Sequence, residues 1–187
     1  RPILIHNGRL YTGLGDSGNI VDERETPRQK IWTYALDGSD PQLFCSGLRN
    51  TEKLVVRPGT DEIWGVDHGS DWFGRTLEQR ENAGQPITDL NPPEEMNKLE
   101  QGKFYGHPFI TGNRVPRYEF MNRPDIVRLA AETTPPEFLF PAHWAPNAME
   151  FYDADQFPGH RGDAFVAFHG SWNRSIPDGY CVARVLF

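Results

Sequence analysis

Residues 54–66 read Leu-Val-Val-Arg-Pro-Gly-Thr-Asp-Glu-Ile-Trp-Gly-Val. Two runs of strand-forming residues here flank the turn residues Arg57-Pro58-Gly59, a pattern that predicts two paired antiparallel strands. Residues 3–12 have the same pattern, with Asn7-Gly8 between two apolar runs, and Asn-Gly is the strongest short hairpin signal. Similar apolar runs occur at residues 31–36, 148–152 and 164–168, and helical periodicity only at 124–132. The sequence therefore predicts an all-β fold.

A charged turn that leads into an apolar strand ending in Gly and polar residues occurs three times, at residues 8–16, 61–69 and 162–170. Repeats of about 40–50 residues that contain several strands are typical of β-propeller blades. The interval between the second and third copies is about twice the first. We attribute it to long insertions at 74–93 and 112–136, which are rich in Pro, Asn and charge, rather than to a degenerate blade. At ~45 residues per blade, the chain holds about four blades at most, so we expect a partial β-propeller as the single domain 1–187.

Composition excludes several classes of protein. The 187 residues include 19 Lys and Arg against 26 Asp and Glu, a net charge of −7 with no basic run, which argues against nucleic-acid binding. No apolar stretch approaches the roughly 18–20 residues of a membrane span. Cys45 and Cys181 permit one disulfide without requiring it, lie in no metal-binding spacing, and are expected as small buried residues. The first residue is Arg1 and the last six are mostly apolar, so we expect an internal fragment of a longer protein.

Two short motifs combine groups that bind anions or cations. Arg49 and Asn50 lie just before a predicted strand, where an Arg can clamp a carboxylate or a quinone oxygen; an ordinary surface salt bridge is the alternative. Asp67-His68-Gly69-Ser70-Asp71 offers two carboxylates and backbone carbonyls, which suit calcium, although a solvated turn would use the same residues. Glu94 and Glu95 could add oxygen ligands, but a charged loop is the preferred interpretation.

Polar and aromatic residues are densest at 143–146, His-Trp-Ala-Pro, and at 169–174, His-Gly-Ser-Trp-Asn-Arg. These segments suit a sugar or an aromatic cofactor through stacking and hydrogen bonds, with aromatic core packing as the alternative. His169 near Ser171 raises the idea of a hydrolase, which the absence of a G-x-S-x-G motif disfavours. Residues 13–18 match G-x-G-x-x-G, but no amphipathic helix follows, so we reject a dinucleotide site.

Taken in order, seven short motifs resemble the soluble quinoprotein sugar dehydrogenases, the glucose/sorbosone dehydrogenase family. They are Gly15-Asp16-Ser17-Gly18-Asn19, Gly47-Leu48-Arg49-Asn50, Asp67-His68-Gly69, Glu94-Glu95-Met96-Asn97, the run from Gly102 to Pro108, His143-Trp144-Ala145-Pro146, and the run from Arg161 to Arg174. The resemblance implies a six-bladed β-propeller that holds pyrroloquinoline quinone (PQQ) and calcium (Ca2+) at one mouth. It also implies hydride transfer from C1 of a sugar to the quinone, with the electrons passed to an external acceptor.

The resemblance assigns roles residue by residue. Arg49 and Asn50 fall on a quinone-contacting pair, and Ser17, His143, His169 and Arg174 fall near the cofactor. The backbone carbonyls of Gly69 and Ser70 fall where the family binds calcium, with Asp67 and Asp71 beside them. The family's catalytic His is expected just before Arg1, outside this sequence.

Two alternatives stay open at this point. One is a propeller of the same lineage that binds a protein or a glycan without catalysis, and the other is a calcium-dependent lactonase-type hydrolase. The resemblance alone implies a secreted or periplasmic location.

Overall fold

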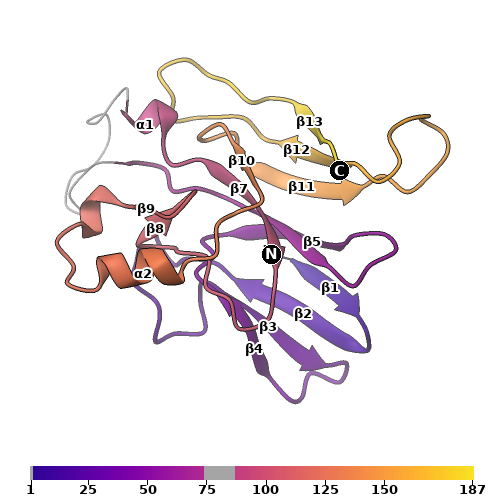
Figure 1. Ribbon diagram of the computed structural model, residues 1–187, viewed down its shortest axis with the longest axis horizontal. Helices are drawn as coiled ribbons and strands as arrows, with labels where there is room; N and C mark the ends of the chain where they lie inside the picture. The colour runs from indigo at the N-terminus through magenta and orange to yellow at the C-terminus, as the bar shows by residue number, and fades with distance from the viewer. Residues whose placement is uncertain (1, 74–86) are drawn as a thin grey trace.

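The computed structural model describes residues 2–73 and 87–187, and most of them belong to antiparallel sheets (Figure 1). Three sheets follow one another along the chain, and we call them blades 1, 2 and 3. Blade 1 comprises β1 (Ile3–His6), β2 (Arg9–Leu14), β3 (Lys30–Ala35) and β4 (Gln42–Ser46). Blade 2 comprises β5 (Thr51–Val56), β6 (Ile63–Asp67), β7 (Glu94–Leu99) and β10 (Phe138–Phe140). Blade 3 comprises β11 (Pro146–Phe151), β12 (Ala164–Phe168) and β13 (Val182–Val185).

The predicted all-β class and the predicted hairpins are confirmed. Asn7 and Gly8 both have positive φ (47° and 72°), as a two-residue hairpin turn between twisted strands requires. Residues 57–62 connect β5 to β6, which pair from Val56 with Ile63 onward. The three recurring segments fall on β2, β6 and β12, the second strand of each blade, so the repeat in the sequence is a repeat in the structure.

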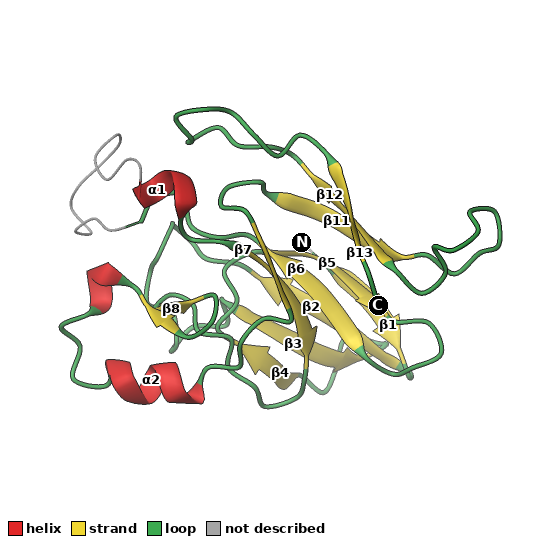
Figure 2. Cartoon of the chain, turned by 45° about the horizontal axis from the view of Figure 1, so that its top comes forward, coloured by secondary structure: helices red, strands yellow, loops and turns green. Residues whose placement is uncertain are grey.

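The long second interval of the repeat comes from an insertion, as expected. Between β7 and β10 the chain forms β8 (Ile110–Thr111), β9 (Val115–Pro116), a 3-10 helix (Tyr118–Phe120) and α2 (Ile126–Glu132). These elements and α1 (Ile87–Leu90) lie together beside one end of the blades in Figure 2. The other predicted insertion, 74–93, lies partly outside the described residues. The described residues form three blades, which agrees with the maximum of about four that the chain length allows.

Two expectations about individual residues are wrong. Glu94 and Glu95, expected in a charged loop, begin strand β7 and are buried. Cys45 is buried, but Cys181 is exposed, and both are free thiols.

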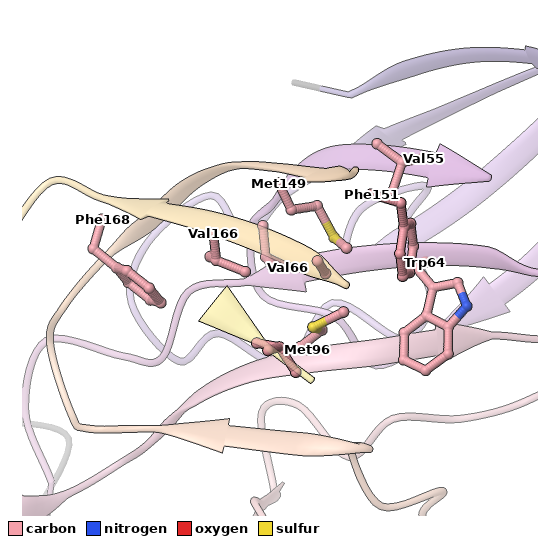
Figure 3. Close-up of a cluster of buried hydrophobic side chains, with 10 residues drawn as sticks. Val55, Trp64, Val66, Met96, Met149, Phe151, Val166 and Phe168 are labelled. Atoms are coloured by element: carbon pink, nitrogen blue, oxygen red, sulfur yellow. The ribbon is translucent and has the colours of Figure 1, made fainter. Parts of the chain in front are cut away.

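Alternating side chains let each blade pack on the next. Blades 2 and 3 enclose a cluster that includes Val66, Met96 and Val166, none of them accessible to solvent (Figure 3). Burial of each such side chain contributes about 1.5–3 kcal/mol. Blades 1 and 2 enclose a second cluster around Ile31 and Leu54. Among the residues that the structure describes, no helix has the length and apolar character of a membrane span.

The meander topology brings the predicted site residues to one end of the blades. Successive antiparallel strands turn at alternate ends, so every second connection lies at the same end. The connections β2–β3, β4–β5, β6–β7, β10–β11 and β12–β13 share this end, which we call the mouth (Figure 1). All ten residues proposed from the sequence lie in these connections or at the end of β6.

Candidate functional site

Arg49 is the centre of the hydrogen-bond network at the mouth. Its side chain is nearly buried, and the whole residue is 7% exposed. Nη1 donates to the carbonyl of Gly69 (2.8 Å), Nε to the carbonyl of Asn19 (3.0 Å), and Nη2 to Oδ1 of Asn19 (2.9 Å). Its backbone N–H donates to Oδ2 of Asp67 at 2.8 Å. Arg49 therefore joins three connections, and the surface-salt-bridge interpretation is wrong.

Asp71 extends this network to blade 3. Its Oδ2 lies 3.5 Å from Nη2 of Arg49, and its carbonyl accepts a hydrogen bond from the side chain of Asn173. The Nδ2 of Asn173 also lies 3.3 Å from Nδ1 of His143. The network thus connects residues from all three blades.

His143 is held as a neutral imidazole. Its Nε2 lies 2.6 Å from the carbonyl of Thr88 and 3.0 Å from that of Asn91, so Nε2 carries the proton and Nδ1 accepts from Asn173. Burial lowers the pKa of His143. Both ring nitrogens are therefore occupied, which suits a positioning role.

The remaining predicted cofactor residues differ in how they join the network. Arg174 is partly buried and donates from Nη1 to the carbonyl of Ala142 (3.2 Å). Asn50 packs against Gly15, where a Cβ would come within 1.8 Å of its Oδ1, so only glycine fits. Ser17 and His169 are exposed, and among the described residues neither side chain forms a hydrogen bond with Arg49.

Three buried carboxyl groups stabilise the connections at the mouth. Asp67 accepts from Arg49 and from Oγ1 of Thr51, Glu94 accepts from the N–H groups of Gly69 (2.8 Å) and Ala145 (3.1 Å), and Glu95 accepts from that of Gly112 (2.8 Å). Burial raises the pKa of Asp67 to about 6, of Glu94 to about 7 and of Glu95 to about 8. Repulsion from the carboxylates of Asp67 and Glu94 raises the pKa of Glu95 further.

The predicted calcium loop, 67–71, offers oxygen donors of the right class. Gly69, Ser70, Asp67 and Glu95 are among the residues that line a cavity of about 20 Å³, together with Arg49 and Arg117. Ser70 is buried, and its Oγ accepts from Nη1 of Arg117 at 2.6 Å. In residues 2–73 and 87–187, no three His, Cys, Asp or Glu side chains converge as a metal site. A cation would therefore depend on backbone carbonyls, which calcium accepts.

Sequence reasoning missed the amides and acids that hold these groups in place. Asn19 and Asn173 lie within two of the motifs that carry the resemblance, but no role is assigned to them there, and no local pattern pairs them with Arg49 and Asp71. Two adjacent acids are usually exposed, so the sequence favours a loop at Glu94. Residues 94–99 read Glu-Glu-Met-Asn-Lys-Leu, with the two apolar residues three apart, so no strand alternation predicts β7.

Comparison with known proteins supports a propeller of the sugar dehydrogenase type. Residues 124–187 match the model of the TrAA12-like family. An uncharacterized protein of Borreliella burgdorferi is 29% identical over 186 residues, which cover 96% of this chain and 43% of that relative. A calcium structure of Trichoderma reesei carbohydrate-active enzyme family AA12 superposes with a TM-score of 0.79 at 21% identity, over 99% of this chain and 52% of the other.

The holo form of the pyranose dehydrogenase PQQ domain from Coprinopsis cinerea gives a TM-score of 0.74 at 21% identity, over 95% of this chain and 49% of the other. The chain thus spans about half the length of these solved structures and less than half of the curated relative. Its fold is the β-propeller fold found in AA12 and PQQ-dependent sugar dehydrogenases, and its residues 124–187 are similar to the TrAA12-like family.

Proposed function

We infer that this chain is part of a sugar dehydrogenase that uses PQQ and calcium. The observation that carries the proposal is the network from Arg49 through Asp71 to Asn173, which joins three blades at the mouth of the propeller. The sugar substrate, an external electron acceptor and a secreted or periplasmic location belong to the same proposal and follow from the resemblance.

Arg49 has the geometry to orient an oxyanion. A guanidinium has five N–H groups, and Arg49 uses three of them toward Asn19 and Gly69. Nη2 also lies 3.5 Å from the Asp71 carboxylate, so the second N–H of Nη1 is the one available to a quinone oxygen, with the Asn50 amide next in the chain. The Ser70 carbonyl and the second lone pair of the Gly69 carbonyl, which accepts from Arg49, would be available to calcium. When bound, PQQ supplies the carbonyl carbon that accepts hydride from the sugar, and calcium supplies Lewis acidity. Arg49, fixed in advance by these hydrogen bonds, stabilises the negative charge that develops.

Neither His143 nor His169 supplies the base in this proposal. Both nitrogens of His143 are occupied, and His169 is exposed outside the network.

Quinone affinity tests the role of Arg49. We expect Arg49→Ala, in the protein as its source makes it, to weaken PQQ binding more than about tenfold, because a charged hydrogen bond to the ligand is lost. The measurement is a fluorescence titration of PQQ with and without calcium. Arg161→Ala is the matched control: Arg161 is an exposed arginine in the β11–β12 connection, at the opposite end of the blades.

Unchanged PQQ affinity in Arg49→Ala would remove Arg49 from the site. Turnover of a lactone without quinone, detected by a fall in pH, would favour the hydrolase instead. Glycan or protein binding with no PQQ affinity at all would favour the non-catalytic propeller.

A further inference from the structure

Two tryptophans, Trp72 and Trp172, pack against each other at the mouth. Trp172, in the β12–β13 connection, is 67% exposed, and its ring meets that of the half-buried Trp72 edge to face, with 5.6 Å between ring centroids and 86° between planes. Large aromatic side chains dominate the energetics of binding sites. An exposed indole beside a polar network is therefore a candidate ligand-binding surface.

The backbone on both sides of Trp172 is anchored. Ser171 is buried, its N–H donates to the carbonyl of Asp178 (2.8 Å), and its Oγ accepts from the N–H of Asp178 (2.9 Å). Asn173 is also buried and bonds to Asp71. Trp172 thus projects from a fixed position, and a fixed aromatic surface loses little conformational entropy when it binds a ligand.

The pair lies directly beside the candidate site. Trp72 follows Asp71 in the chain, and Asp71 lies 3.5 Å from the guanidinium of Arg49. The Asp71 carboxylate is partly exposed and can accept hydrogen bonds from hydroxyl groups. Indole and carboxylate together present one apolar surface and one hydrogen-bond acceptor.

We propose that Trp172, supported by Trp72, binds a pyranose ring of the carbohydrate substrate by stacking. The C–H face of a pyranose is flat and apolar and can stack on the indole of Trp172. The hydroxyl groups at the edge of the ring can donate hydrogen bonds to the Asp71 carboxylate. A negatively charged sugar fits poorly beside Asp71, so the ligand class is neutral pyranosides. This inference rests on the proposed function and names its substrate-binding surface.

Sugar binding to the protein without PQQ tests the inference. The probes are glucose and cellobiose, followed by calorimetry and intrinsic tryptophan fluorescence. We expect Trp172→Ala to weaken binding by about tenfold and Trp172→Phe to stay within about threefold of wild type. Ile176→Ala is the matched control, because Ile176 is 77% exposed on the same connection but is not aromatic.

PQQ affinity, measured in parallel, should be the same in Trp172→Ala and wild type, which shows that the mouth remains folded. Equal sugar affinity in Trp172→Ala and wild type, or no binding of either sugar to wild type, overturns the inference. Sugar binding that depends on Trp172 in a protein without PQQ affinity supports this site while rejecting the proposed dehydrogenase.

Discussion

At the scale of single residues, buried charge determines how the mouth responds to pH. Glu95 is buried, and its Oε2 lies 3.5 Å from Nδ2 of Asn97. The Oδ1 of Asn97 is buried and has no hydrogen-bond partner within the described residues. A protonated Glu95 can donate to that oxygen if the amide turns, which an ionised Glu95 cannot do. The local geometry therefore agrees with the raised pKa of Glu95.

Glu95→Gln is expected to stabilise the protein at pH 8 and to have little effect at pH 4. In the unfolded chain Glu95 ionises near pH 4.5, whereas in the folded protein its pKa is about 8. Between these values the folded state binds more protons, so the free energy of unfolding falls as pH rises. Glutamine does not ionise and can still donate to Asn97, so we expect a Tm higher by ~3–6 °C at pH 8.

The measurement is thermal unfolding at both pH values in the presence of a calcium chelator. Glu150→Gln, a change at an exposed glutamate of blade 3, is the matched control. A Glu95→Gln variant less stable than wild type at pH 8 would contradict the protonated state of Glu95.

Among single residues, the sequence predicted those whose chemistry is recognisable in a short motif. It missed those whose role depends on a partner far away in the chain. Arg49 and the 67–71 loop stood out because a cation and oxygen donors have recognisable uses. Glu94 and Asn173 did not, because their partners, Gly69 and Asp71, lie 25 and 102 residues away along the chain. No local pattern encodes contacts of that separation.

At the scale of elements, the insertion between β7 and β10 is attached to blade 1 through its backbone. Ser46 and Phe104 form a parallel bridge, and the N–H of His107 donates to the carbonyl of Gly47 at 2.9 Å. A Cβ on Gly47 would lie 2.6 Å from the Phe104 ring and 2.7 Å from the Gly106 nitrogen. The close approach of the two backbones therefore requires glycine at position 47.

Gly47→Ala should destabilise the protein far more than Gly38→Ala. Both glycines have φ near +80°, so each substitution costs about 1–2 kcal/mol of backbone strain. A Cβ at Gly38 meets nothing within 4 Å, whereas at Gly47 it displaces the insertion, which adds about 1–3 kcal/mol. Urea unfolding monitored by tryptophan fluorescence measures both. Equal urea midpoints for the two variants would show that the insertion moves to accommodate the Cβ at position 47 without loss of stability.

Strands with alternating apolar residues were predictable, and elements stabilised by distant contacts were not. The hairpins β1–β2 and β5–β6 are encoded by their turns, and α2 by its periodicity. Strand β7 begins with two glutamates, which favour a loop until the N–H groups of Gly69 and Gly112 are placed beside them. The small strands β8 and β9 have only two residues each, too few for any periodicity.

At the scale of the whole molecule, blade 1 has one buried and one exposed face. Ile31 and Cys45 pack on blade 2, while Ile3 and Ile5, on the opposite face, are 72% and 65% exposed. Leu43 lies on the same face through the pairings of β1 to β4 and is also exposed. A sheet face that exposes several neighbouring apolar side chains favours association.

The 187-residue chain should therefore self-associate, and Ile5→Lys should reduce that association. A lysine in the middle of the exposed face cannot be buried against another sheet without the cost of removing its charge from water. Sedimentation velocity should show an average mass that rises with concentration for wild type and stays near the monomer for the variant. Ile176→Lys is the control, since Ile176 is also strongly exposed (77%, against 65% for Ile5) but lies at the mouth. A wild-type chain that remains monomeric at every concentration would show that the exposed face of blade 1 does not drive association. If both lysine variants reduced association equally, the cause would be the added charge and not the loss of packing on this face.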